Sequence, residues 1–340
     1  MAGADLGDAR LSKRLGQLSD DLAEMPGESF PKALRESAPL EAAYRFFSNP
    51  NVTLNRILDP HFAGTAARCD PFEQVLVVHD TTEFEFDGEV EREGLGRLLA
   101  SGQGFFGHFS LAVSADLRRE PLGLLGLSTV FRRGTPVPKK HRAKQPRGEA
   151  QRWRAGADDA EARLRGRTRA IHVMDREGDA YPLLAGLATS GHDFVIRGAH
   201  DRLLNGPIRK LREAAQHAPT VIEREVQLSR RGKASGTKKA KIYPARSART
   251  TRLSLAATRV VLAPPITAGS PRELPINLVH VFELGPPAGA PAVEWLLLTT
   301  LPVDTPEALA FVVDSYRARW VIEEYFKALK TGCLELIPFR

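Results

Sequence analysis

Cysteine is scarce in this 340-residue sequence, which contains only Cys69 and Cys333. Two cysteines so far apart do not make a disulfide framework or a cysteine-based zinc site. The sequence also lacks a run of 18 apolar residues and a signal-peptide pattern after Met1. A membrane-spanning helix and secretion are therefore not expected, and we predict a cytoplasmic protein of about two domains.

Acidic residues are nearly absent from two stretches that are rich in lysine and arginine. Residues 132–154 contain nine Lys or Arg against a single acid, Glu149, and residues 229–252 contain nine and no acid. The net charge of the whole chain is +7. Two such clusters suit contacts with the phosphates of a nucleic acid. The alternative interpretation is a pair of solvated, mobile loops.

The spacing of apolar residues changes near residue 70. Residues 1–60 predict helices, because Leu11, Leu15, Leu18 and Leu22 recur at helical spacing and residues 38–53 form a second amphipathic segment. From residue 74 the expected order is β-β-β-α-β-α-β. Its expected strands are 74–80, 105–116, 121–133, 170–175 and 193–200, with helices at about 148–165 and 180–188. Residues 219–302 are expected to be mostly β, followed by one closing helix from about 305 to 331.

Two aspartates directly follow apolar strands in this scheme. Asp80 comes after "VLVVH" and Asp175 after "AIHVM". A carboxylate at the end of a buried strand loses its hydration unless it is paired, hydrogen-bonded or bound to a metal. Taken singly, each could simply cap a turn, and Arg176 could be the ion-pair partner of Asp175.

A row of polar residues marks the predicted closing helix. Tyr316, Arg319, Glu323 and Lys330 follow one another at i, i+3, i+7 and i+14, so a continuous helix would place them in one narrow stripe. The alternative is an exposed face held by pairs such as Glu323 with Lys327. Glu323, brought beside Asp80 and Asp175, would complete an all-oxygen site for Mg²⁺ or Mn²⁺. Two such ions can promote displacement at a phosphodiester.

The order of elements and this trio of carboxylates predict an α/β protein with a ribonuclease-H-like catalytic core. The expected parts are a helical domain at 1–60, the first part of the core at 70–218, a β-rich insertion at 219–302 and the closing helix with Glu323 at 303–340.

These residues resemble the bacterial cut-and-paste DDE transposases of the insertion-sequence-four family, close to the Tn-five group. The family's Y-x2-R-x3-E-x6-K signature is matched by Tyr316, Arg319, Glu323 and Lys330. Its two aspartate motifs are matched by Asp80 in "VVHDTTEF" and Asp175 in "MDREGDAY". Its N-terminal DNA-binding helices are matched by "LGDARLSKRL" (6–15) and "AYRFFSNPNV" (43–52).

The resemblance implies roles for further residues and partners. Trp295 in "EWLLLTT" matches a tryptophan that stacks on an extruded base, and Arg197 in "FVIRGAH" matches a basic residue that faces DNA. The alternatives are a core tryptophan and a strand-end arginine in a surface salt bridge. Arg319, Lys330 and Tyr316 would contact phosphates beside Asp80, Asp175 and Glu323, which would bind two Mg²⁺ or Mn²⁺ ions. The implied partners are double-stranded transposon ends and target DNA, in the bacterial nucleoid.

Members of that family continue past the "KTG" motif into a helical region that pairs two subunits on DNA. This sequence ends at "CLELIPFR" (333–340), and nothing in it resembles that region. The family's homodimer is therefore not expected for this chain without DNA. A competing hypothesis is a DNA-binding relic or inhibitor that does not transpose. A stand-alone nuclease would leave the N-terminal helices and Trp295 without a purpose.

Overall fold

The computed structural model describes residues 3–25, 28, 30–86, 92–98, 102–132, 148–228, 245–265, 273–290 and 292–333. Its contacts divide the chain into two compact units, Met1–Ala170 with Ala318–Arg340, and Ile171–Arg317. We call these the first and the second unit. Most of the two basic clusters lies outside the described residues, since 133–147 and 229–244 fall in the gaps. The four predicted domains stay a prediction.

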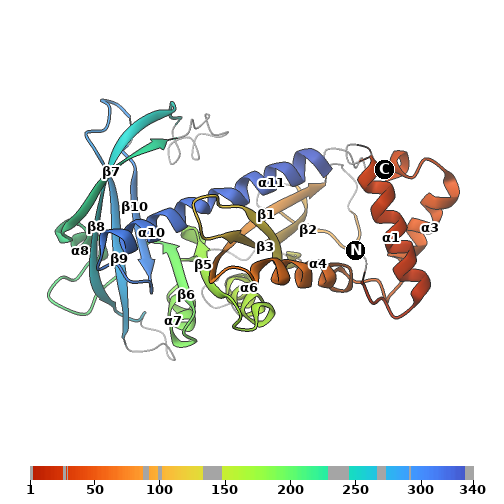
Figure 1. The fold of residues 1–340 in the computed structure, drawn as a ribbon, viewed down its shortest axis with the longest axis horizontal. Coiled ribbons are helices and arrows are strands. Elements are labelled where there is room, and N and C mark those ends of the chain that lie inside the picture. Colours follow the sequence, from red (N-terminus) through yellow and green to blue (C-terminus); the bar gives the residue numbers. More distant parts are fainter. Residues whose placement is uncertain are drawn as a thin grey trace. The chain divides into compact units, whose positions relative to one another are not determined.

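The N-terminal part of the first unit is helical, as predicted. Asp8 caps α1 (Ala9–Glu24), because its carboxylate accepts the N–H of Arg10. Two further helices follow, α2 (Phe30–Ala33) and α3 (Ser37–Phe47), and Figure 1 shows α1 and α3 side by side. Their shared core is apolar and consists of Ala4, Leu6, Leu15, Leu18, Leu34, Ala43 and Phe46. Burial of this leucine-rich face is what holds such short helices together.

The rest of the first unit is built on an antiparallel sheet. Its strands are β1 (Gln74–Phe86), β2 (Gly96–Arg97), β3 (Gln103–Ser114) and β4 (Pro121–Val130). β1 pairs with β3 along its whole length, and β2 and β4 pair with β3 at its other edge. The three predicted strands are confirmed, but the predicted end of the first strand at Asp80 is wrong. β1 continues to Phe86 because "TTEFEF" is rich in Thr and Phe, which favour strands, and has its own partners on β3.

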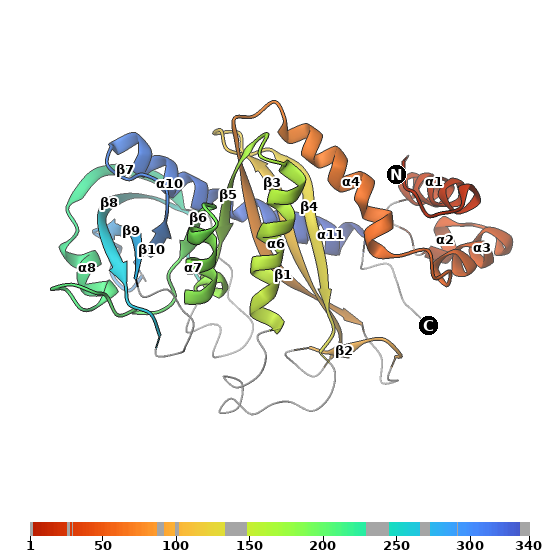
Figure 2. The same ribbon diagram turned by 90° about the horizontal axis from the view of Figure 1, so that it is seen from below.

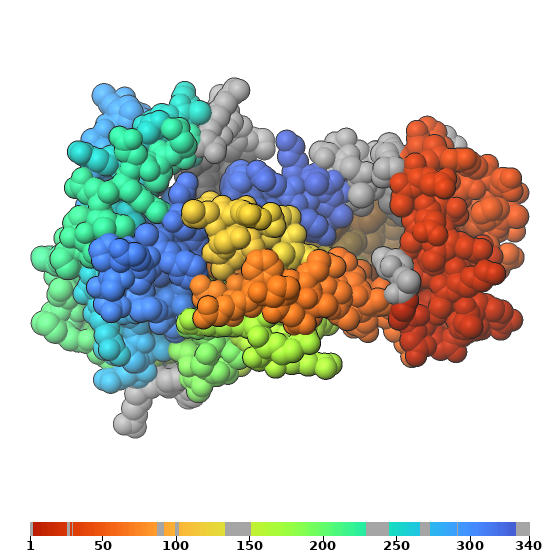
Figure 3. Space-filling view, viewed as in Figure 1, coloured from red at the N-terminus to blue at the C-terminus, as the bar shows by residue number. Residues whose placement is uncertain are grey.

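Helices cover both faces of this sheet. α4 (Leu54–Cys69) and α6 (Gly148–Leu164) pack on one face, and α11 (Trp320–Cys333) contacts β1. Figure 2 shows α6 and α11 on opposite sides of β1 and β3. In the space-filling view of Figure 3, α4 (orange) lies beside the lime helix α6, and both helices contact the strands β3 and β4. None of the described helices is long and apolar enough to cross a membrane.

The two faces of β1 differ because side chains alternate along a strand. Val75 and Val77 join the core beneath α4 and α6, together with Cys69, Leu125 and Leu164. Burial raises the pKa of the Cys69 thiol to about 11, so the thiol is a neutral core residue at physiological pH. By the same alternation Asp80 points to the other face, towards α11.

The second unit contains a mixed sheet. β5 (Arg169–Met174), whose first two residues belong to the first unit, runs parallel to β6 (Asp193–Arg197). β6 then pairs antiparallel with β10 (Glu294–Thr299), and the sheet continues through β9 (Leu274–Leu284) and β8 (Arg249–Leu262) to β7 (Thr220–Leu228). The remaining elements are the 3-10 turn η1 (Arg176–Gly178), α7 (Tyr181–Thr189), α8 (Leu211–His217) and α10 (Pro306–Ala318). The described part of 219–302 is mostly β, as predicted.

The prediction of a single closing helix is wrong. Residues 306–333 form two helices, α10 and α11, which are separated by a turn at Arg319. No proline or glycine lies between Glu307 and Thr331, so a helix-breaking residue is not the cause. The N–H of Ile322 bonds to the carbonyl of Arg319 at 3.2 Å, which is the tighter, three-residue closure of a 3-10 turn. Tyr316 therefore lies on a different helix from Glu323 and Lys330.

A buried histidine lies beneath α6. Nδ1 of His108 is 2.9 Å from Oγ1 of Thr81, and its ring packs edge-on against Trp153 with centroids 4.7 Å apart. α6 can approach so closely because it has Gly156 there, where a Cβ would lie 3.1 Å from Nε2 of His108. Burial, with a smaller effect of Arg152, lowers the pKa of His108 to about 3. The imidazole is thus neutral in the folded protein.

This geometry predicts an acid-sensitive first unit. The folded pKa of His108 lies below its ordinary value of 6.5, so the stability that depends on it is complete above pH 6.5 and decreases as the pH falls towards 3. His108→Gln, which retains a polar partner for Thr81, should flatten the decline in the free energy of unfolding between about pH 7 and about pH 4.5. The measurement is urea unfolding at several pH values. The exposed His200→Gln is the control, and an equal flattening in that variant would contradict this interpretation.

Candidate metal and DNA-binding site

Asp80 lies in the middle of β1, on the face opposite to the one that contributes Val75 and Val77 to the hydrophobic core. It lies opposite Phe109 of β3, and its side chain is only 15% exposed. One carboxylate oxygen, Oδ1, accepts the N–H of Thr81 at 2.7 Å. The other oxygen, Oδ2, faces the side where α11 packs. Asp80 is therefore a nearly buried carboxylate that needs a cationic partner on that side.

Arg319 supplies this positive charge. Its Nη1 donates to Oδ2 of Asp80 at 2.9 Å, and its Nη2 donates to Oε1 of Glu323 at 3.1 Å. The Arg319 side chain is 14% exposed and the Glu323 side chain 40%. One planar group thus joins the two carboxylates with charge-assisted hydrogen bonds. These contacts bring Asp80, Arg319 and Glu323 together within the first unit, and their predicted catalytic, metal-binding and DNA-binding roles stay predictions.

Apolar contacts fix the height of α11 above Asp80. Phe326 packs edge-on against Phe109 at a centroid distance of 5.2 Å, and Tyr325 contacts the same ring at 6.0 Å. Phe109 is the cross-strand neighbour of Asp80. Because Phe326 is one turn beyond Glu323 on α11, the packing that buries it also holds Glu323 close to the strand.

Asp175 occupies a turn in the second unit, directly after β5. It precedes η1 as its N-cap, with Oδ1 accepting the N–H of Glu177 at 2.8 Å. Both its position after an apolar strand and its possible capping role were predicted from the sequence. Among the residues that the structure describes, no three His, Cys, Asp or Glu side chains are grouped so as to hold a metal ion. The convergence of Asp175 with Asp80 and Glu323 stays a prediction.

The acid at the end of the same "DREGD" motif has a structural role that the sequence did not indicate. Asp179 is fully buried in its side chain and accepts the N–H groups of Ala199 and His200 at 2.6 and 3.0 Å. Nε of Arg202 donates to it at 2.7 Å. Asp179 therefore fastens the turn that carries Asp175 to the segment after β6. The sequence feature that could have indicated this role is the spacing of four residues between Asp175 and Asp179.

Trp295 and Tyr316 contact each other within the second unit. Trp295 lies on β10 with a half-buried ring, and Tyr316 lies on α10 with 7% of its surface exposed. Their ring centroids are 5.5 Å apart at an angle of 62°. The edge-on contact orients the Trp295 ring. The predicted base-stacking role of Trp295 and the predicted phosphate contact of Tyr316 stay predictions, and Lys330 lies in the last turn of α11.

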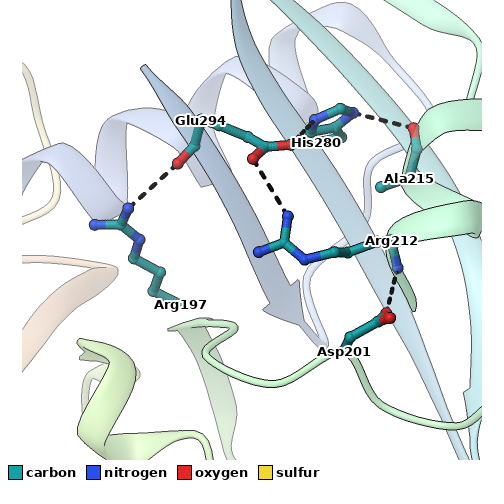
Figure 4. Close-up of polar contacts among 6 residues, drawn as sticks. All are labelled: Arg197, Asp201, Arg212, Ala215, His280 and Glu294. Atoms are coloured by element: carbon teal, nitrogen blue, oxygen red, sulfur yellow. Dashed lines mark hydrogen bonds and ion pairs between the residues drawn. The ribbon is translucent and has the colours of Figure 1, made fainter. Parts of the chain in front are cut away.

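Arg197, at the end of β6, is attached to the residue that precedes Trp295. Its Nη2 donates to the main-chain carbonyl of Glu294 at 3.2 Å. Figure 4 shows Arg197 and Arg212 approaching Glu294, with Nη1 of Arg212 at 3.4 Å from Oε2. Two basic side chains thus lie next to the strand of Trp295. The predicted contact of Arg197 with DNA stays a prediction.

Glu294 is also held by a histidine. Nε2 of His280 lies 3.1 Å from Oε1 of Glu294, while Nδ1 lies 3.0 Å from the carbonyl oxygen of Ala215. Both ring nitrogens therefore face oxygen acceptors, as Figure 4 shows. These contacts fix the start of β10 and with it the backbone of Trp295.

Residues 1–52 match the family model described as a transposase DNA-binding domain. This segment contains α1, α2 and α3 and the turn that follows them. The predicted N-terminal DNA-binding helices are thereby supported, and DNA is a partner of a protein with such a domain. A transposase-related, DNA-binding role follows for the chain.

The buried Asp179 gives a prediction on stability. Asp179→Ala should destabilise the second unit by about 3–5 kcal/mol, because it leaves the Arg202 charge and two N–H groups without their acceptor. Thermal unfolding followed by circular dichroism measures the effect. Asp201→Asn is the matched control, because Asp201 accepts the N–H of Arg212 near the surface. If the two variants unfold at the same temperature, the anchoring role of Asp179 is wrong.

Proposed function

We propose that this chain is a metal-dependent DNA transposase of the insertion-sequence-four family, close to the Tn-five group, with a ribonuclease-H-like catalytic core. The observation that carries the proposal is the cluster of Asp80, Arg319 and Glu323. It brings together two residues of the predicted closing signature and the first predicted catalytic aspartate. The transposase-type DNA-binding match of residues 1–52 supports it independently.

The donor set fits Mg²⁺ or Mn²⁺. Carboxylate oxygens are the ligands that these hard cations prefer, and Asp80 and Glu323 already share one positive charge through Arg319. With Asp175 they would hold two ions. Such ions, when bound, supply an activated water or 3′-hydroxyl and stabilise the leaving oxygen of a phosphodiester.

The other residues of the site would orient DNA. Arg319 and Lys330 would hold phosphates, for which a guanidinium offers a planar pair of donors. Trp295 would stack on a base that has left the duplex, and Arg197 and Tyr316 would support the strand beside it. Tyr316 can serve in this way through its contact with the Trp295 ring.

The proposed reaction is a series of displacements at phosphorus. Water nicks one strand at each transposon end, and the freed 3′-hydroxyl attacks the opposite strand to close a hairpin. A second water opens the hairpin, and the 3′-hydroxyl then attacks target DNA. Each step breaks one phosphodiester bond as another bond to the same phosphorus forms, so one site can serve them all.

A second candidate function is DNA binding without strand cleavage, as in a relic or an inhibitor of an active transposase. The observation that favours it is the family match, which covers residues 1–52 and concerns DNA binding. The two functions differ in whether the chain cuts DNA in the presence of Mg²⁺ or Mn²⁺.

Substitution of the carboxylates separates these functions. Asp80→Asn and Glu323→Gln should each reduce cleavage of transposon-end DNA by about 10³-fold, since several kcal/mol of transition-state stabilisation depend on the metal site. DNA binding should persist in both variants. Gel assays of cleavage and of binding measure the two effects, with the exposed Asp304→Asn as the control. Binding without any cleavage by the unsubstituted chain would favour the second function.

A further prediction concerns Trp295. Trp295→Ala should slow hairpin formation by about 10-fold to 100-fold, which corresponds to the loss of about 1–3 kcal/mol of base stacking. Trp295→Phe should restore most of the rate. Single-turnover assays that separate nicking from hairpin closure measure this effect. If Trp295→Ala lowers the thermal stability and slows nicking equally, the tryptophan is a core residue instead.

A further inference from the structure

We propose that Arg319 couples metal binding to DNA binding. In the free chain its guanidinium bonds to Asp80 and Glu323, the two carboxylates that the metal requires. A DNA phosphate that attracts the guanidinium releases these carboxylates for the cation. This inference rests on the proposed function, because it concerns the regulation of the same site.

The first step of the argument is the position of the guanidinium. Nη1 and Nη2 each bond to a different carboxylate, at 2.9 and 3.1 Å. A divalent cation bound to the same oxygens would be close to this positive charge and repelled by it. The side chain is 14% exposed, so solvent screens the repulsion only in part. Metal binding to the free chain is therefore weakened by Arg319.

The second step is the comparison with a neighbouring arginine pair. At Asp314 two guanidiniums face one carboxylate, because Arg224 bonds to both of its oxygens at 2.8 and 3.0 Å and Arg317 to one at 3.1 Å. Arg319 instead bonds to two different carboxylates, those of Asp80 and Glu323. The Arg224 guanidinium thus binds both oxygens of one acid, whereas the Arg319 guanidinium bridges two acids.

The third step is how the contact can open. Arg319 lies in the turn between α10 and α11, and Glu323 is 40% exposed. Phosphate is an alternative partner of the same bidentate kind for a guanidinium. Rotation of the Arg319 side chain towards a phosphate would remove a positive charge from the carboxylates and place it on the DNA.

Thermodynamic linkage makes the coupling between metal binding and DNA binding reciprocal. If DNA raises the affinity for the cation by a given factor, the cation raises the affinity for DNA by the same factor, and such factors are typically about 5–150. The chain would thus load the cations that promote strand cleavage mainly when a phosphate backbone is already in place.

The test is Mn²⁺ binding to the full chain, followed by the electron paramagnetic resonance signal of free Mn²⁺ at constant ionic strength. Without DNA, Arg319→Gln should bind Mn²⁺ at least about 5-fold more tightly than the unsubstituted chain. A short DNA duplex should raise the Mn²⁺ affinity of the unsubstituted chain by at least that factor and leave Arg319→Gln nearly unchanged. Arg319→Lys, which cannot span both carboxylates with a planar fork, should lie between the two.

Two controls distinguish the possible failures. Arg317→Gln removes one positive charge two residues away, so an equal gain in that variant would reduce the effect to net charge and overturn the inference. Asp80→Asn should lose Mn²⁺ binding. If it loses binding while Arg319→Gln gains nothing, the metal site exists and the coupling is wrong. If Asp80→Asn binds Mn²⁺ as the unsubstituted chain does, the proposed metal site itself fails.

Discussion

The contact of Arg319 with the carboxylates of Asp80 and Glu323 is the interaction on which the proposed site in the first unit depends. It joins residues 239 positions apart, one on β1 and one in the turn before α11. The first unit consists of two separate chain segments, Met1–Ala170 and Ala318–Arg340. This ion pair and the packing of Phe326 on Phe109 attach the C-terminal segment to the sheet of the N-terminal segment. Burial of a phenylalanine side chain contributes about 1.5–3 kcal/mol to the free energy of unfolding. The packing of Phe326 therefore stabilises the position of α11 against β1, next to the contact of Arg319 with Asp80.

One strand, β1, contributes to both the core and the proposed site because its side chains alternate between two faces. On one face of β1, Val75 and Val77 join the core, and His108 of the paired strand is held neutral beneath α6. On the other face Asp80 meets α11. Substitution of His108 should therefore change the pH dependence of the free energy of unfolding, whereas substitution of Asp80 should change metal binding.

Periodicity predicted most of the elements, since apolar spacing determines which segments can bury a face. The positions of the carboxylates suggested that Glu323 would lie near Asp80, but the sequence did not predict that Arg319 would bond to both of them. The sequence did not predict the extension of β1 to Phe86, because that stretch is stabilised by pairing with β3, a long-range contact. It did not predict the break at Arg319, where no proline or glycine marks a turn, or the burial of Asp179, whose partners are about 20 residues distant in the chain.

The central claim is that Asp80, Asp175 and Glu323 form one metal site from which Arg319 withdraws towards DNA. Anomalous diffraction at the manganese edge, from crystals of the chain grown with a DNA duplex and Mn²⁺, tests it most directly. The account predicts an anomalous peak bonded to oxygens of all three carboxylates, with the Arg319 guanidinium on a phosphate. A manganese peak elsewhere, with Arg319 still joining Asp80 to Glu323, would contradict it.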